Sequence, residues 1–189
     1  MKRALTAKEQ QDILGQDPQY QAMMAQRRRE WAENAALLRK DEEPLVAALN
    51  SAGWPEAVRQ CGETRSVWDL VNTAEPYPHL LDTLVDHLAR PYHRRTREGI
   101  ARSLAVGEAK GTRIPRSMMA ELKKETDPSE GPNSYRWAII NTLISIGDSS
   151  IADDVKELLA DARYESVRPH LSRLAKKVTS SRQRPPQES

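Results

Sequence analysis

Apolar residues recur every three or four positions through most of this chain, and that spacing constrains its fold more than any other feature. One stretch carries Leu80, Leu81, Leu84, Val85 and Leu88, which share one face of a helix. Alternating runs of β-branched and aromatic residues, which are typical of strands, are nearly missing. The sequence therefore predicts an all-α protein.

Proline and glycine mark the ends of the predicted helices. A long helix is expected to begin at Pro18 with Asp17 as its N-cap, and a second to run from Asp41 to about Ala52. Two short helices separated by a turn at Gly62 are expected within 56–74. Six further helices follow in pairs, over about 76–90, 92–106, 114–126, 133–146, 149–161 and 164–177, with a stop at Asp127-Pro128 and a turn at Gly131-Pro132.

This pattern predicts three parts of the chain. Residues 1–40 form an N-terminal helical extension, 41–178 form an array of helix pairs, and 179–189 form a tail. The tail is polar and cannot bury a core, so we expect it to be disordered.

Composition agrees with a helical array and narrows the setting. The chain has 189 residues, of which 38% are hydrophobic and 30% charged, as suits helices that each bury one stripe. The lone cysteine, Cys61, favours a reducing compartment. The N-terminus lacks the apolar segment of a signal peptide, and no run approaches the ~18 apolar residues of a membrane span. We expect a cytoplasmic protein that does not bind membranes.

The stretch from Asp148 through Val155 and Leu158 to Asp161, followed by Val167-Arg168, Leu171 and Leu174, resembles a HEAT repeat. Such repeats have an Asp in the turn between two helices and an Arg early in the second helix. Asp161 with Arg168 matches this pattern, Asp127 with Arg136 matches it more loosely, and Arg97 lacks the preceding Asp. Over about 42–178 the chain is similar to stand-alone bacterial HEAT-repeat proteins.

This resemblance implies a fold and a range of functions. The fold is an α-solenoid of about three to four HEAT-like antiparallel helix pairs, with an added N-terminal helix. Most such arrays are protein-binding scaffolds, some bacterial ones act as antitoxins or immunity proteins, and a minority bind DNA. The resemblance also implies that the second helix of each pair lines one common face.

Charge is unevenly divided between the two helices of each pair. The second helices carry an excess of Lys and Arg, whereas the first helices carry an excess of Asp and Glu. Helical spacing places Arg97, Arg136 and Arg168 at the edge of the core, so we expect them to be structural. The side chains expected to contact a partner are Arg94, Arg95, Arg102, Tyr135, Arg173 and Lys177, and Ala138 and Thr142 are expected to point outward beside them.

We expect a non-catalytic protein whose basic second-helix face binds a protein with an acidic surface. An antitoxin- or immunity-type inhibitor is one form of such a protein. One alternative is nucleic-acid binding, through the DNA or RNA backbone, at the same face. Another is a basic face that is only solvated. A HEAT-fold base-excision glycosylase would need an acid and aromatic side chains converging in a groove, and Tyr135 and Glu98 supply little of this.

Several other residues have a functional and a structural interpretation, and the structural one is favoured. His79, Asp82 and Asp86 share one helical face and could hold a divalent metal, but an acidic surface with Asp86 paired to Arg90 is the preferred interpretation. Trp68 and Trp137 could stack on bases, but are assigned to packing. No catalytic triad or phosphate loop is found, so we expect no catalytic residue, cofactor, metal or small-molecule substrate.

Overall fold

A computed structural model describes residues 6, 15–125 and 135–182 of the chain. The protein is all-α: helices and turns account for the described ranges, and none of those residues is in a strand. The chain divides into two compact units, Met1–Lys40 and Asp41–Ser189. The expected stop at Asp127-Pro128, the turn at Gly131-Pro132 and most of the expected C-terminal tail lie outside the described residues.

The first long helix, α2 (Pro18–Ser51), is continuous, so the predicted break before Asp41 is wrong. Its start is as expected, because the carboxylate of Asp17 accepts a hydrogen bond from the backbone N–H of Gln19 at 2.9 Å. The acidic run at Asp41 and Glu42, followed by Pro44, resembles a helix start. The structure shows that these two carboxylates instead cap other helices.

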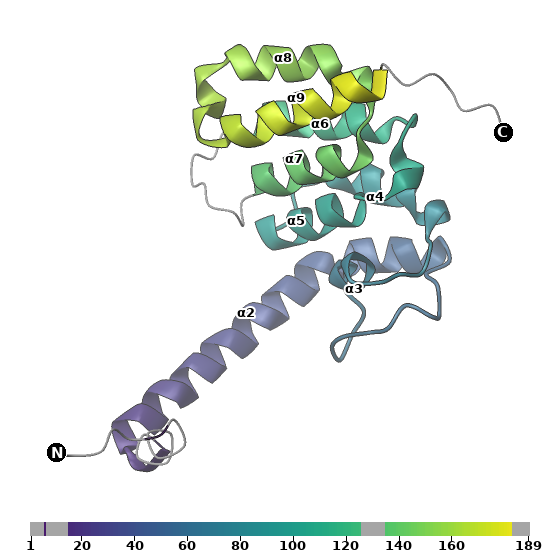
Figure 1. Cartoon of the computed structure of the whole chain (residues 1–189). Helices are drawn as coiled ribbons and strands as arrows, with labels where there is room; N and C mark the ends of the chain where they lie inside the picture. The colour runs from purple at the N-terminus through teal and green to yellow at the C-terminus, as the bar shows by residue number, and fades with distance from the viewer. Residues whose placement is uncertain (1–5, 7–14, 126–134, 183–189) are drawn as a thin grey trace. The chain divides into compact units, whose positions relative to one another are not determined.

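The second unit contains the remaining helices (Figure 1). They are α3 (Val67–Val71), η1 (Pro78–Leu80), α4 (Leu81–Leu88), α5 (Arg94–Ser103), η2 (Gly107–Ala109), α6 (Ile114–Lys124), α7 (Tyr135–Ile146), η3 (Ser149–Ile151), α8 (Ala152–Ala160), η4 (Ala162–Val167) and α9 (Arg168–Arg182). Only one short helix forms within 56–74, and α9 extends past the predicted end at 177.

These helices pack in a regular order. The pairs α4 and α5, α6 and α7, and α8 and α9 are each in contact. Helices α3, α5, α7 and α9 also contact one another in sequence, and α4 contacts α6 (Figure 1). Side chains at equivalent positions of α3, α5, α7 and α9 are therefore brought next to one another, although the helices are far apart in the chain.

The starts of α3 and α5 are held by two carboxylates of α2. Glu42 accepts hydrogen bonds from the backbone N–H of Val67, at 2.5 Å, and from the Ser66 hydroxyl, at the N-terminus of α3. Asp41 accepts from the backbone N–H of His93 and from the Thr96 hydroxyl, at the N-terminus of α5. Such contacts satisfy N–H groups that a helix leaves unpaired.

Glycine permits a close contact between α3 and α5. Gly99 lies in α5 against α3, where a Cβ atom would come too close to Cγ1 of Val67 and would lie 3.0 Å from Nε1 of Trp68. The backbones of α3 and α5 can approach only because residue 99 has no side chain. This approach positions Trp68 beside α5.

Candidate functional site

Aromatic rings and guanidinium groups alternate across the four helices that follow one another in contact. The Arg95 guanidinium of α5 lies over the Trp68 ring of α3, 3.7 Å from its centroid. Arg102 of α5 lies 5.1 Å from the centroid of Trp137 of α7. The Trp137 ring meets the His170 ring of α9 edge to face, with centroids 6.2 Å apart.

Three side chains of α9 extend this row. His170, Arg173 and Lys177 are spaced by three and four residues and so lie on one face of α9. Arg173 and Lys177 are exposed, and the Lys177 stem lies close to Gly147, where a Cβ would be 2.8 Å from its Cε atom. We call the surface made by Trp68, Arg95, Arg102, Trp137, His170, Arg173 and Lys177 the arginine–tryptophan face.

One carboxylate lies beneath this face. Glu98 of α5 is buried, and its Oε1 atom lies 2.8 Å from Nη2 of Arg102. Its Oε2 atom lies 3.5 Å from Nη1 of Arg95, a longer contact. The side chain of Arg95 is 54% exposed and that of Arg102 is 27% exposed. Arg102 is therefore held by Glu98, whereas Arg95 remains available to a second anion.

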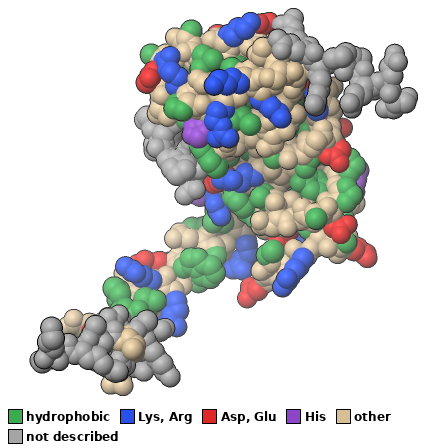
Figure 2. All heavy atoms as spheres, in the orientation of Figure 1, with side chains coloured by type: hydrophobic (Ala, Val, Ile, Leu, Met, Phe, Trp, Pro, Cys, Tyr) green, Lys and Arg blue, Asp and Glu red, His purple; other side chains and the backbone are tan. Residues whose placement is uncertain are grey.

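Figure 2 shows this side of the second unit, with Lys and Arg side chains gathered over α9 and α5. Of the predicted contact residues, Arg95, Arg102, Arg173 and Lys177 are brought together on the arginine–tryptophan face. Arg94 is the exposed first residue of α5.

The prediction that Tyr135 points outward is wrong. Its side chain is 1% exposed, and Ala138 and Thr142 of the same helix are also buried. Helix α7 packs against α5 on one side, α9 on the other, and α6 as well, so it has more than one buried face. Burial raises the pKa of Tyr135 to about 12, although the Arg97 guanidinium, 4.1 Å from the ring centroid, opposes the increase.

The three arginines expected to be structural do make internal contacts. Arg97 lies within 3.5 Å of both Glu121 and Glu125 of the neighbouring pair. Arg136 is buried and donates to the backbone carbonyls of Glu125, at 2.8 Å, and Arg163, at 3.3 Å. A guanidinium at this position therefore joins the ends of two helix pairs through their backbones.

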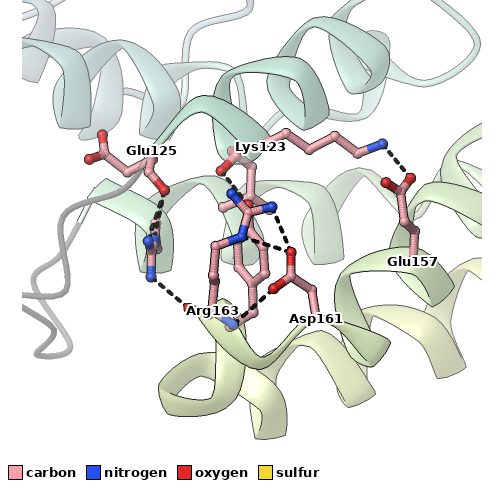
Figure 3. A network of polar contacts seen from close by, with 8 residues as sticks. Lys123, Glu125, Glu157, Asp161 and Arg163 are labelled. Carbon is pink, nitrogen blue, oxygen red and sulfur yellow. Dashed lines mark hydrogen bonds and ion pairs between the residues drawn. The ribbon is translucent and has the colours of Figure 1, made fainter.

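Arg168 does not form an ion pair with Asp161, the aspartate that matches the HEAT-repeat pattern together with it. Arg168 donates to the Leu159 carbonyl at 3.0 Å and forms an ion pair with Glu165. The Asp161 carboxylate instead binds the side chain and backbone N–H of Arg163, and these hydrogen bonds hold the pKa of Asp161 below its ordinary value (Figure 3).

Lys123 crosses between α6 and α8 in the same region. Its ammonium lies 2.8 Å from Asp154 and 2.7 Å from Glu157, the latter drawn in Figure 3. Hydrogen bonds to Asp154 and then Glu157 raise the pKa of Lys123 to about 12. The Lys123 ammonium is therefore used within the fold.

His79, Asp82 and Asp86, the three residues that could have held a metal, also make contacts within the fold. Asp82 and Asp86 both pair with Arg113, at 3.1 Å and 2.8 Å, so the expected pairing of Asp86 with Arg90 is wrong. A ring nitrogen of His79 lies 2.7 Å from the Gly53 carbonyl oxygen. Within the described ranges, no three His, Cys, Asp or Glu side chains are grouped as metal ligands.

A cleft of about 520 Å³ opens beside the arginine–tryptophan face. Its walls come from the end of α3, the segment before η1, the end of α5 and the middle of α7. Leu70, Tyr77, Ala138 and Thr142 are the buried residues among its walls. Its polar and charged lining residues that are not buried are Thr73, Glu75, Arg102, Glu108, Asn141 and Ser145.

Two tryptophan–asparagine pairs on this surface were not predicted. In α3 the Asn72 side-chain amide donates to the Trp68 carbonyl at 2.9 Å, and in α7 that of Asn141 donates to the Trp137 carbonyl at 3.0 Å. Each pair is a Trp-x-x-x-Asn sequence. Residues four apart share a helix face, so the asparagine lies next to the tryptophan. The recurrence of this short pattern at 68–72 and 137–141 is the signal that could have found them.

No family model, curated protein or solved structure matches this chain. Among the helices that the structure describes, none combines the length and the apolar character that crossing a membrane requires.

Proposed function

We propose that this chain is a non-catalytic α-solenoid of HEAT-like helix pairs, and that it binds a protein with an acidic surface through the arginine–tryptophan face. The successive contacts of α3, α5, α7 and α9 support the solenoid, because each pair touches the next. Inhibition of a toxin or other acidic enzyme is one form that such binding could take.

One observation carries the proposal. The row from Trp68 and Arg95 through Arg102 and Trp137 to His170 joins four helices and ends beside two exposed cations, Arg173 and Lys177. Arginine and tryptophan dominate the binding energy of many protein interfaces. A guanidinium that rests on an indole ring is already positioned, so it loses less freedom when it binds a carboxylate.

The test measures binding of fluorescent polyglutamate and of duplex DNA to the native protein at roughly 50 and 200 mM salt. The face variant is Arg95→Glu with Arg173→Glu. A matched control, Arg90→Glu with Arg116→Glu, makes the same change of charge at exposed positions outside this face. We expect polyglutamate binding that the face variant loses and the control keeps.

Two outcomes would contradict the proposal. Equal polyglutamate binding by the face variant and the control would show that another surface binds acids. Tight duplex DNA binding that falls steeply with salt and depends on Arg95 and Arg173, without polyglutamate binding, would instead support binding of a nucleic-acid backbone.

A further inference from the structure

The two tryptophan–asparagine pairs hold their amides in the same way. Asn72 and Asn141 each donate a side-chain N–H to the carbonyl four residues earlier, which fixes the orientation of the amide group. The Oδ1 atom of each asparagine is then a positioned hydrogen-bond acceptor at the surface, where Asn72 is exposed and Asn141 is partly exposed. A fixed acceptor of this kind suits the N–H group of a peptide backbone.

The two pairs lie at adjoining pockets: Asn141 lines the cleft, whereas Asn72 lines a neighbouring pocket that shares Thr73 and Glu75 with it. Val71 and Thr73, which flank Asn72, line the cleft with Asn141 of α7. Helix α5 separates α3 from α7, and packed helices lie about 8–10 Å apart, so the two helices are roughly 16–20 Å apart. About six residues of extended chain, at about 3.3 Å each, span that distance.

The charge of this surface determines which side chains an extended peptide bound there should carry. Arg95 lies between the two pairs along the row, and Arg173 and Lys177 lie beyond Trp137 on α9, so carboxylates are favoured over both regions. Within the cleft, Arg102 is already bound by Glu98, and Glu75 and Glu108 add negative charge. Side chains that enter the cleft itself should therefore be small and uncharged.

We propose that the partner is bound as an extended acidic peptide segment that crosses α3, α5, α7 and α9, with Asn72 and Asn141 accepting hydrogen bonds from its backbone. This inference rests on the proposed function and specifies it. Arg95 and the α9 cations select acidic side chains, and the two asparagines select a chain that exposes its backbone. A folded acidic surface, whose backbone N–H groups are already paired, would not satisfy these asparagines.

The experiment uses a fluorescein-labelled peptide of twelve residues that alternates glutamate and alanine. Self-repulsion of its charges keeps such a peptide extended. The second probe is the same peptide with N-methyl-alanine at every alanine position, which removes backbone N–H donors and keeps the charge. Both are titrated into the full chain and into Asn72→Ala with Asn141→Ala, and Asn34→Ala on α2 is the matched control.

We expect the double asparagine variant to bind the unmodified peptide about ten-fold more weakly than the native chain, as the loss of two modest hydrogen bonds predicts. The native chain should also prefer the unmodified peptide to the N-methylated one, and this preference should disappear in the double asparagine variant. The Asn34→Ala variant should behave as the native chain.

The outcomes separate this inference from the proposed function. If Arg95→Glu with Arg173→Glu abolishes peptide binding while the double asparagine variant binds and discriminates as the native chain does, acidic recognition stands and the backbone-reading role is wrong. If neither peptide binds the native chain, the inference also fails. Helical circular dichroism of each variant checks that lost binding is not lost folding.

Discussion

Glu98 and Arg102 form an ion pair inside the surface that we propose to bind acidic partners, with Glu98 Oε1 2.8 Å from Arg102 Nη2. Because the carboxylate is buried and the guanidinium is partly exposed, the pair neutralises positive charge on the face without exposing a carboxylate there. The number of cations in the sequence therefore overstates the charge that a partner meets.

Replacing Glu98 tests this directly. The Glu98→Gln variant should bind polyglutamate more tightly than the native chain, because Arg95 and Arg102 lose their internal anion. It should also lower the free energy of unfolding by roughly 1–3 kcal/mol, since hydrogen bonds to a charged group are lost. Titration and urea denaturation measure the two effects. The exposed pair of Glu165 with Arg168 supplies the control, Glu165→Gln, and weaker binding by Glu98→Gln would refute this account.

The close contact at Gly99 predicts a purely steric effect on stability. Gly99→Ala should lower the free energy of unfolding by about 1–3 kcal/mol, because the new methyl group meets Val67 and Trp68 and pushes α3 away from α5. The ordinary gain in helix propensity from glycine to alanine, about 1 kcal/mol, would not offset this. Gly107→Ala, where no atom lies within 4 Å of the added group, is the control. Equal thermal unfolding midpoints for the two variants would contradict the tight contact.

Tyr135 should give the protein a measurable sensitivity to alkali. Its pKa is raised by burial from 10.0 to about 12, so the folded state keeps the phenol proton where the unfolded state loses it. The stability that Tyr135 contributes is complete below pH 10 and is lost as pH rises through about 12. Urea denaturation at increasing pH should show a shallower decline for Tyr135→Phe than for the native chain, whereas Tyr20→Phe should decline as the native chain does.

Asp148 should give the opposite dependence at acidic pH. Burial favours the protonated carboxyl, but hydrogen bonds from Gly111 N–H, at 2.6 Å, and Ser150 outweigh it and hold the pKa of Asp148 below 3.8. Its contribution is complete above pH 3.8 and is lost as pH falls through the lower, folded-state pKa.

Asp148→Asn should therefore lower the free energy of unfolding by roughly 1–3 kcal/mol at neutral pH. The difference from the native chain should shrink in acid. Asp153→Asn, on the exposed start of α8, controls for the change of charge. A difference between Asp148→Asn and the native chain that is unchanged by acid would mean that the carboxylate charge is unimportant there.

The sequence predicted α4 to α9 well because proline, glycine and the apolar stripes all mark the same boundaries. It failed at α7, where Tyr135, Ala138 and Thr142 are buried in addition to the predicted stripe. A helix in the middle of an array has neighbours on several sides, and Ile139, Ile140 and Ile146 already indicate a helix with more than one apolar face.

The charged part of the site was only partly predictable. Helical spacing correctly placed Arg95 and Arg102 away from the core, because that depends on each helix alone. Spacing within one helix could not show that Arg95 stacks on Trp68, since this contact requires the packing of α5 on α3. The row of rings and guanidinium groups is a property of neighbouring helices.

Asp41 and Glu42 are consecutive in the chain, and they hold the first turns of two different helices, α5 and α3. The backbone N–H groups of His93 and Val67 are therefore anchored by one short piece of backbone. If that piece unwinds even briefly, both helix starts lose their acceptors in the same event. Hydrogen exchange at those two amides would then share one opening rate, and the indole and guanidinium that α3 and α5 contribute would loosen together.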